Sequence, residues 1–247
     1  MAMHNLFSLA GDRILLTGAV GGIGSATARV CSSLGAELIL VDRQSSEALA
    51  RELSANGTKA TSITADTTDR QTVEDIVANA EPLDAVVDCA GRFITEDWLT
   101  DPNWDESCRK VLEVNVLAPL NLARAVMPKM MERKKGRIVL LGSVAGRNGG
   151  AARETQAHYA ASKGGVHSMV RWLSRRAAPH GVNVNGLAPG PVDTAMNATA
   201  SHSIDSFPMH RLGRPEEIAW PAAFLCSRAA SYMSGAILDV NGGVFVG

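Results

Sequence analysis

Tyr159 and Lys163, four residues apart in the stretch YAASK, are the side chains in this sequence best suited to move a proton. The surrounding pattern favours a helix, so this spacing places the phenol and the ammonium on one face, a turn apart. A free phenol ionises near pH ~10, and proton exchange near neutrality therefore needs a neighbouring positive charge. Two unit charges about 4 Å apart interact by roughly 4 kcal/mol at an effective dielectric of about 20, or about three pKa units. We expect Lys163 to lower the pKa of Tyr159; the alternative is an ordinary surface pair.

A glycine-rich stretch, TGAVGGIG, lies where an apolar run gives way to a helical pattern over Ser25 to Leu34. Glycine accepts a tight turn and lets the backbone approach a pyrophosphate, while a helix N-terminus offers unpaired N–H groups and partial positive charge. The alternative is a tight strand-to-helix connection without a ligand. The positions expected to contact phosphate are Gly18, Gly22, Ile23 and Gly24.

Asp42 ends the second apolar run, eighteen residues after Gly24. An acidic side chain at this point can accept hydrogen bonds from an adenosine ribose and repel a 2′-phosphate. Arg43 beside it could instead pair with such a phosphate, or it is simply a solvated arginine at a strand end. We therefore expect NAD as the cofactor in preference to NADP, with Asp42 and Arg43 at the ribose.

The elements that position these residues alternate between apolar, β-branched runs and longer helical patterns, which predicts a parallel sheet. Helical crossovers then cover both of its faces, giving a doubly wound, three-layered, Rossmann-like α/β domain over residues 1–247. Ligands of such sheets bind at the carboxyl ends of the strands. The predicted strands are Arg13–Leu16, Glu37–Val41, Lys59–Thr64, Leu83–Asp88, Arg137–Leu141, Asn183–Ala188 and Ala236–Val240.

Composition argues against other classes of partner. The formal net charge is -1, and the longest basic cluster is Arg133 to Lys135, so a nucleic-acid partner is not expected. Met1 to Ala10 lacks a cationic start and an apolar core, and no stretch approaches the roughly twenty apolar residues of a membrane span. We expect a cytoplasmic protein with no membrane partner. Its cysteines, expected to be buried thiols because they form no CxxC pair, are Cys31, Cys89, Cys108 and Cys226.

Together the motifs resemble the short-chain dehydrogenase/reductase family over nearly the whole chain. In order they are TGAVGGIG, Asp42, Ala90-Gly91, Asn115, Ser143, YAASK and Pro189-Gly190 through Thr194. The resemblance is to the short single-domain branch, similar to carrier-protein ketoacyl reductases and to many sugar, steroid and xenobiotic alcohol dehydrogenases. It implies hydride transfer between NAD(H) and a secondary alcohol or ketone, and a homotetramer.

The resemblance also implies the catalytic roles. Ser143 would hydrogen-bond the substrate oxygen, Tyr159 would give or take its proton, and Lys163 would also hold the nicotinamide ribose. Asn115 would hold a water in a proton relay through Lys163; alone, such an asparagine is more often a satisfied core amide. Prepositioned hydroxyl donors suit this chemistry because an alkoxide-like oxygen develops during hydride transfer.

Further cofactor contacts follow from the same resemblance. Asp66, with Thr67 beside it, would contact the adenine, although Asp66 is also a helix N-cap candidate. The backbone of Val192 and the hydroxyl of Thr194 would reach the nicotinamide amide and phosphate, or this segment is only a rigid Pro/Gly turn. The remaining positions are Ala90, Gly91, Pro189 and Gly190.

Two features depart from the family pattern. Asp88-Cys89 replaces the usual asparagine pair and places a carboxylate, with no evident partner, near a sheet end. The segment between Ser143 and Tyr159 is also longer than usual, and either shapes the substrate pocket or is a solvated surface loop. Its polar residues are Arg147, Arg153, Glu154 and Gln156.

The region Pro189 to Pro215 lacks strand signals, and we expect a substrate lid near 193–214. Within it, Ala195 to Pro208 is expected to order over bound cofactor and substrate, with Met196, Ile204 and Phe207 as sparse apolar contacts. A static surface loop is the alternative.

Several broader alternatives remain. A noncatalytic dinucleotide sensor of the same fold would regulate a partner, but such sensors tend to lose the reactive residues. An epimerase or dehydratase needs a larger substrate domain than the chain after Pro189 allows. His158 and His167 are expected to be structural, because no ligand partner is suitably spaced. The helices Trp104 to Arg133 and Ala157 to Pro179 carry apolar positions on several faces, which favours burial against other subunits.

Overall fold

The computed structural model describes residues 6–150, 155–198 and 204–247. Within these ranges one parallel sheet has the strand order β3-β2-β1-β4-β5-β6-β7. Its strands are β1 (Arg13–Thr17), β2 (Glu37–Asp42), β3 (Ala60–Thr64), β4 (Ala85–Asp88), β5 (Gly136–Leu141), β6 (Val182–Pro189) and β7 (Ile237–Val240). The predicted α/β class and doubly wound parallel sheet are confirmed, with strand bounds within two residues of those expected.

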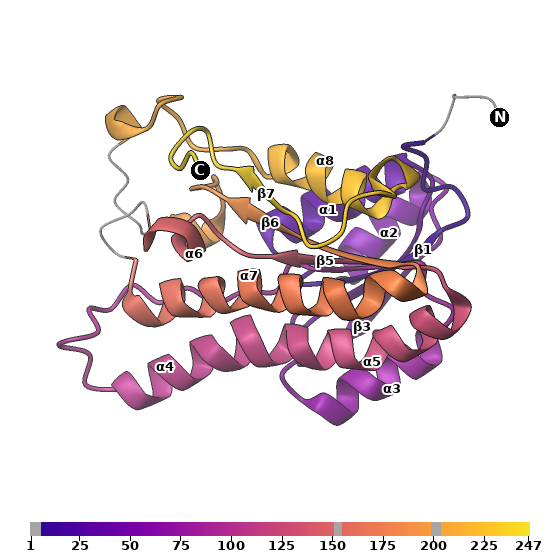
Figure 1. Ribbon diagram of the computed structural model, residues 1–247, viewed down its shortest axis with the longest axis horizontal. Coiled ribbons are helices and arrows are strands. Elements are labelled where there is room, and N and C mark those ends of the chain that lie inside the picture. The colour runs from indigo at the N-terminus through magenta and orange to yellow at the C-terminus, as the bar shows by residue number, and fades with distance from the viewer. Residues whose placement is uncertain (1–5, 151–154, 199–203) are drawn as a thin grey trace.

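Helices cover both faces of this sheet (Figure 1). One face packs against α1 (Gly22–Ser33), α2 (Glu47–Ala55) and α8 (Pro215–Cys226). The other packs against α3 (Arg70–Ala80), α5 (Ala118–Arg133) and α7 (Ala157–Ala177), with α4 (Trp104–Leu112) beside α7. Short helical turns are α6 (Ala145–Asn148) and the 3-10 turns Ala178–His180, Ala195–Asn197, Ile204–Ser206 and Arg228–Ala230.

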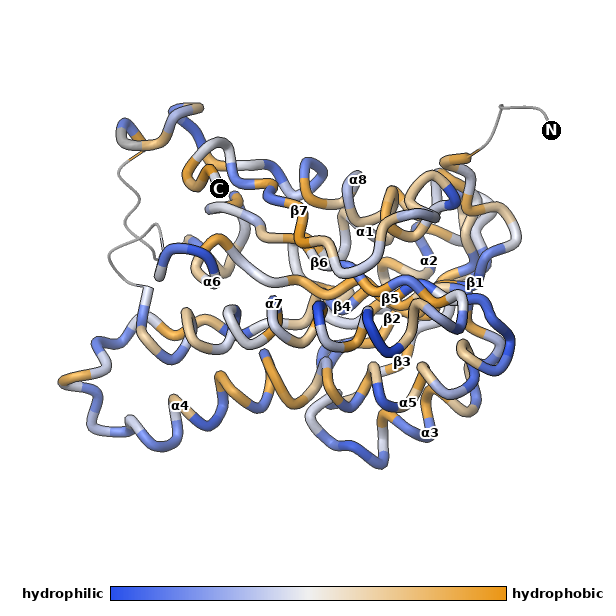
Figure 2. The backbone as a smooth tube through the Cα atoms, in the orientation of Figure 1, coloured by the Kyte–Doolittle hydropathy of each residue, from blue (hydrophilic) through white to orange (hydrophobic). Residues whose placement is uncertain are grey.

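The core consists of two apolar layers, one on each side of the sheet. Neighbouring residues of a strand point to opposite faces, so Leu16 joins the layer under α1 and α8, while Leu15 joins the layer under α5 and α7. Both are almost fully buried. A strand covered on both faces must be apolar at successive positions, and Figure 2 shows these hydrophobic strands at the centre of the molecule.

The strand order reverses between β1 and β4, which lie side by side at the middle of the sheet. Thr17 and Asp88 are register partners at the carboxyl ends of these two strands. The connections that leave β1 and β4 run to opposite sides, and this divergence opens a crevice. The glycine-rich stretch and Ala90-Gly91 therefore meet at one edge of the sheet.

Asn115 lies in a break of helical geometry. The α4 helix continues into a five-residue π-helical turn, Glu113–Leu117, before α5 begins. The helical stretch expected from Trp104 to Arg133 is present, but its π turn was not predicted. Such turns commonly occur at functional sites because they redirect a side chain within an otherwise regular helix.

Among the described residues, no helix combines the length and the apolar character needed to cross a bilayer.

Candidate active site

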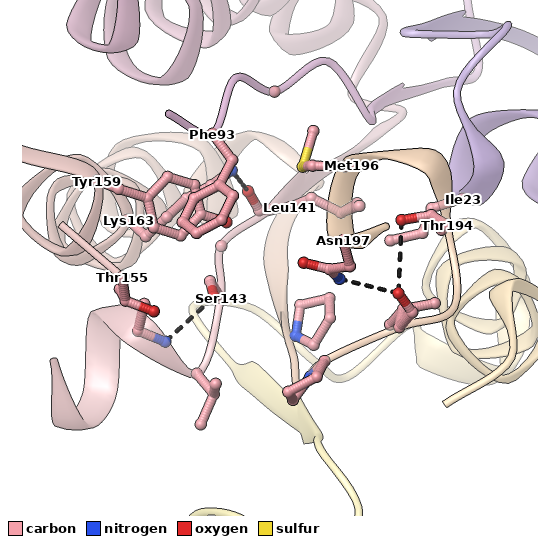
Figure 3. A pocket seen from close by; sticks show the side chains of 18 of the residues that line it. Ile23, Phe93, Leu141, Ser143, Thr155, Tyr159, Lys163, Thr194, Met196 and Asn197 are labelled. Atoms are coloured by element: carbon pink, nitrogen blue, oxygen red, sulfur yellow. Dashed lines mark hydrogen bonds between the residues drawn. The ribbon is translucent and has the colours of Figure 1, made fainter. Parts of the chain in front are cut away.

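A pocket opens where the loops after β4, β5 and β6 meet the beginning of α7 (Figure 3). These segments are far apart in the sequence, and the parallel sheet brings their ends together. The predicted site residues that line the pocket are Ile23, Ala90, Gly91, Ser143, Tyr159, Lys163, Pro189, Gly190, Val192 and Thr194. The motifs identified along the sequence therefore converge on one cavity.

Tyr159 lies in the first turn of α7 and lines the pocket together with Ser143. The Phe93 ring packs edge-on against it, with ring centroids 4.8 Å apart and an interplanar angle of 73°. Burial raises the pKa of Tyr159 above its ordinary value, while a hydrogen bond with the Ser143 hydroxyl opposes this rise. The phenol is thus held in place and, in the protein without cofactor, remains protonated at neutral pH.

Lys163 is buried one turn further along α7, with 4% of its surface exposed. Its Nζ donates a hydrogen bond to the Leu141 carbonyl at 2.8 Å and lies 5.9 Å from the centroid of the Tyr159 ring. Burial lowers the pKa of Lys163 to about 8, although the acidic groups of Asp88 and Cys89 act in the opposite direction. The prediction that the pKa of Tyr159 is lowered is wrong for the protein without cofactor. Burial raises this pKa by more than the hydrogen bond with Ser143 lowers it.

Ser143 lies two residues beyond the end of β5. Its Oγ accepts a hydrogen bond from the Ala145 N–H at 3.1 Å, and the neighbouring Gly142 N–H donates to the Leu187 carbonyl at 2.8 Å. Behind this turn lies the buried ring of His167: a Cβ at Gly142 would be 2.2 Å from its Nε2. Only glycine fits this position, and the turn that presents Ser143 is tightly packed.

The Asn115 side chain is buried and fully engaged. Its Oδ1 accepts from the Arg92 N–H at 2.8 Å, and its Nδ2 donates to the Arg92 carbonyl and to Ser162 Oγ, both at 3.0 Å. The amide thereby joins the loop after Gly91 to α7. The structure gives Asn115 a positioning role, and its part in a proton relay stays a prediction.

The glycine-rich loop packs closely against other segments of the site. Gly18 has a φ of +65°, and a Cβ there would lie 2.6 Å from the Ala90 nitrogen. A Cβ at Gly22 would lie 2.6 Å from Thr194 Cγ2, and one at Gly24 would lie 2.0 Å from the Gly18 carbonyl oxygen. Glycine is required here by close approach. Because α1 begins at Gly22, earlier than expected, these glycines also form its first turn, where N–H groups have no helical partner.

Asp42 is fixed above the same loop. Its Oδ2 accepts a hydrogen bond from the Val20 N–H at 3.0 Å, and its Oδ1 accepts from the Gln44 N–H at 2.9 Å. Arg43 is exposed to solvent. The carboxylate at the end of β2 is therefore the group with a defined position beside the glycine-rich loop.

Asp66 and Thr67 lie outside the lining of the pocket. Asp66 accepts from the N–H and the hydroxyl of Thr68 at 2.9 and 2.8 Å, whereas Asp69 caps α3 by accepting from the Thr72 N–H at 2.7 Å. The alternative interpretation of Asp66 as the helix N-cap is wrong. Its contact with the adenine stays a prediction.

Asp88 has partners that the sequence did not reveal. Its carboxylate is buried, and it accepts a hydrogen bond from the Thr17 hydroxyl and another from the Ala90 N–H. Burial raises the pKa of Asp88, while Thr17, the positive charge of Lys163 and the Ala90 N–H oppose that rise.

The segment between Ser143 and Tyr159 divides into two parts with different roles. Arg147 forms a bidentate ion pair with Asp239 at 3.1 and 3.2 Å and donates to the Ile237 carbonyl at 3.0 Å, so it ties α6 to β7. Thr155 lines the pocket. Gln156 is buried and accepts from the Trp98 N–H at 3.1 Å. Arg153 and Glu154 lie outside the described residues.

Several pocket residues had no motif to identify them. Phe93, Leu141, Thr155 and Asn197 line the cavity because neighbouring motifs carry them there (Figure 3). A hydrophobic residue close after Ala90-Gly91 was the one available signal for Phe93. Leu141 was expected only as the end of a strand, and Thr155 and Asn197 could not be distinguished from ordinary loop residues. Met196, expected as an apolar contact of the lid, also lines the pocket.

Both histidines of α7 are buried, and their ring nitrogens His158 Nδ1, His158 Nε2 and His167 Nε2 have no hydrogen-bond partner in the described part of the chain. His158 packs edge-on against Trp104 at 5.1 Å, and no group of three potential metal-binding side chains occurs among residues 6–150, 155–198 and 204–247. The expectation of buried thiols is correct for Cys31 and Cys226. It is wrong for Cys89 and Cys108, which are partly exposed.

The described parts of the predicted lid are anchored at both ends. Met196 lines the pocket from a short 3-10 turn, and Asn197 donates to the Val192 carbonyl at 2.8 Å. Phe207 is buried. Residues 199–203 of the expected lid lie outside the described residues, and its ordering on binding stays a prediction.

Comparison with known proteins supplies independent information. The profile of the short chain dehydrogenase family matches residues 12–205. Galactitol 2-dehydrogenase (L-tagatose-forming) from Cereibacter sphaeroides is 39% identical over 259 residues, covering 100% of both chains. A 3-oxoacyl-[acyl-carrier protein] reductase with bound NAD from Brucella melitensis is 30% identical, with a TM-score of 0.89 over 98% of this chain and 94% of that one. A 3-oxoacyl (acyl-carrier-protein) reductase with NADP bound, from Agrobacterium tumefaciens C58, is 30% identical, with a TM-score of 0.86 over 98% and 97%.

Proposed function

The chain belongs to the short-chain dehydrogenase/reductase family, and we propose that it transfers a hydride between NAD(H) and a secondary alcohol or its ketone, with Tyr159 as general acid/base. As a member of that family it is an NAD(P)-dependent oxidoreductase acting on alcohol or ketone substrates. The observation that carries the finer proposal is the meeting of Ser143, Tyr159 and Lys163 in one pocket, beside a glycine-rich loop packed too closely for side chains.

The residues present fit a dinucleotide. Gly18, Gly22 and Gly24 leave a backbone surface free of Cβ atoms, and the unpaired N–H groups at the start of α1 suit a pyrophosphate. When bound, NAD(P) supplies or accepts the hydride and, in its oxidised form, contributes a positive charge. Asp42 would hold the adenosine ribose at the far end of the loop.

The proton transfer would be carried out by side chains of the protein. The hydroxyls of Ser143 and Tyr159 would donate hydrogen bonds to the substrate oxygen, where negative charge develops. Tyr159 takes the proton from an alcohol or gives it to a ketone oxygen. Because burial raises the pKa of Tyr159, this role needs nearby positive charge, and the buried Lys163 ammonium is the cation placed on the same helix face.

We favour NAD because Asp42 has a defined position over the glycine-rich loop, where its negative charge would repel a 2′-phosphate. The relatives do not decide this point, since one reductase is described with NAD and another with NADP. Arg43 is the residue that could favour NADP.

The test is reduction of NAD or NADP by the purified protein with a panel of secondary alcohols and polyols, and oxidation of NADH or NADPH with 3-oxoacyl thioesters and simple ketones. Formation or loss of the reduced nicotinamide is followed by its absorbance. Turnover of any member supports the proposal. Tight cofactor binding without turnover of the panel would favour the noncatalytic sensor, and absence of cofactor binding would contradict both.

We also propose a homotetramer, supported by apolar side chains that remain exposed on the outer helices. These include Leu112, Leu117, Leu120 and Trp172 on one side of the sheet and Trp220 on the other. The cytoplasmic location stays a prediction.

A further inference from the structure

The end of β4 carries a buried carboxylate where the family pattern has a neutral amide. Asp88 exposes 4% of its surface, and Lys163 also exposes 4%. A buried charge is costly unless hydrogen bonds and an opposite charge compensate it. The groups around Asp88 therefore decide whether its carboxylate carries a charge.

Three groups stabilise the ionised form of this carboxylate. Thr17, its register partner on β1, donates a hydrogen bond to Oδ1, and the Ala90 N–H donates a second. The third group is the positive charge of Lys163. Hydrogen-bond donors and a cation favour the negatively charged carboxylate over the neutral acid.

Lys163 approaches from α7. A Cβ on Gly91, three residues after Asp88, would lie 3.8 Å from Nζ, so the ammonium sits directly over the segment that follows β4. The titratable groups facing it are Asp88 at the end of β4, Cys89 directly after β4, and Tyr159 and His167 from its own helix. Among the described residues, Asp88 is the one carboxylate acting on Lys163, whose direct hydrogen bond goes to the neutral Leu141 carbonyl.

We propose that Asp88 is a positioning residue whose carboxylate is the buried counter-charge that keeps Lys163 protonated, and the site able to bind its cofactor, into the mildly alkaline range. Without this charge, burial alone would act on the lysine and favour its neutral form. The inference rests on the proposed role of Lys163 in holding the cofactor.

The substitution that tests this is Asp88→Asn, which keeps the shape and an acceptor for the Thr17 hydroxyl but removes the charge. The matched control is Asp84→Asn on the same segment of chain. Asp84 pairs with Lys135 at 2.6 Å and accepts from the Arg13 N–H at 2.9 Å, beyond the opposite end of β4. Both variants lose one negative charge, but only one loses it beside Lys163.

The measurement is the affinity for NADH, by its fluorescence on binding, from pH 6 to pH 10 for each protein. Since the pKa of Lys163 is about 8 with Asp88 present, wild-type affinity should fall through that region. Removing the opposite charge should move this fall to lower pH by about one unit in Asp88→Asn. The affinity near pH 6, where lysine stays charged, should change little, and Asp84→Asn should follow the wild type.

A second variant covers the case in which Asp88→Asn fails to fold. Asp88→Ser removes the same charge with a smaller side chain that can still hydrogen-bond the Thr17 hydroxyl, so the fall in affinity should again move to lower pH. Coincident pH profiles for the wild type and a folded Asp88 variant would overturn the proposal, as would an equal loss of affinity at every pH. Failure of the wild type to bind either reduced cofactor would instead contradict the proposed function.

Discussion

At the scale of single residues, burial sets the protonation of three side chains along one face of α7. It raises the pKa of Tyr159, lowers that of Lys163 to about 8 and lowers that of His167 to about 4. Each shift favours the neutral form. His167 is therefore uncharged near pH 7 and lies behind Gly142, so Lys163 is the cationic side chain that lines the pocket, and Tyr159 is the residue placed for proton transfer.

Replacing Tyr159 by Phe should lower kcat by roughly 100-fold to 10,000-fold, because a positioned acid/base contributes that much and the hydroxyl is the only group lost. The ring contact with Phe93 at 4.8 Å does not need the hydroxyl, so the melting temperature and the affinity for NAD should stay close to those of the wild type. Steady-state kinetics and calorimetric titration measure the two effects. Retained kcat at neutral pH would contradict the role of Tyr159.

Changing Asp42 to Ala should weaken binding of NAD and improve use of NADP, since the hydrogen-bond acceptor at the ribose and the repulsion of a 2′-phosphate are lost together. The quantity to compare is the ratio of kcat/KM for the two cofactors. The carboxylate also holds the Val20 N–H, so an equal loss for both cofactors would point to a disturbed loop. A wild-type preference for NADP would show that Arg43 dominates.

At the scale of elements, strand positions were predictable because buried parallel strands must be apolar at successive positions, as ELILVD in β2 shows. The meeting of the site motifs was predictable too, since parallel strands present their carboxyl ends at one edge. The π turn at Glu113–Leu117 was not, because tertiary contacts of Asn115 with Arg92 and Ser162 accompany it and local propensity does not encode them. The hydrogen-bond partners of Asp88 could not be predicted either, because Thr17 reaches it only through the tertiary fold.

The turn between β5 and α6 gives a prediction at this scale. A Cβ at Gly142 would lie 2.2 Å from His167 Nε2 and 3.0 Å from the Leu187 carbonyl oxygen. Gly142→Ala should therefore lower the free energy of unfolding by about 1 to 3 kcal/mol, as overpacking typically does. Turnover should fall further than stability alone explains, because the turn holds Ser143.

Denaturant unfolding and kcat measure these effects, and His167→Ala in the Gly142→Ala background should recover part of both by making room. Gly165→Ala on α7 is the control, since a Cβ there meets only Val116, at 3.9 Å. Equal behaviour of the two alanine variants would contradict the packing argument.

At the scale of the whole molecule, the faces turned away from the sheet expose large apolar side chains. The outer surface of α4, the π turn and α5 exposes Leu112, Leu117 and Leu120, and α7, which contacts these elements on the same side of the sheet, exposes 62% of Trp172 (Figure 1). On the opposite side α8 exposes 53% of Trp220. Clustered large apolar side chains of this kind mark subunit contacts.

Two distinct apolar faces on opposite sides of the sheet are what a tetramer with two kinds of two-fold contact requires. We therefore expect the wild type to have the mass of a tetramer, measured by light scattering after gel filtration. Trp172→Glu and Trp220→Glu should each disrupt one contact and yield dimers, because a carboxylate buried against another subunit is costly, and the double variant should yield monomers. Leu99→Glu is the matched control: Leu99 is 74% exposed but lies in the loop before α4 and on no helix, and its variant should remain a tetramer. A monomeric wild type would contradict the prediction, and so would tetramers that survive both tryptophan substitutions.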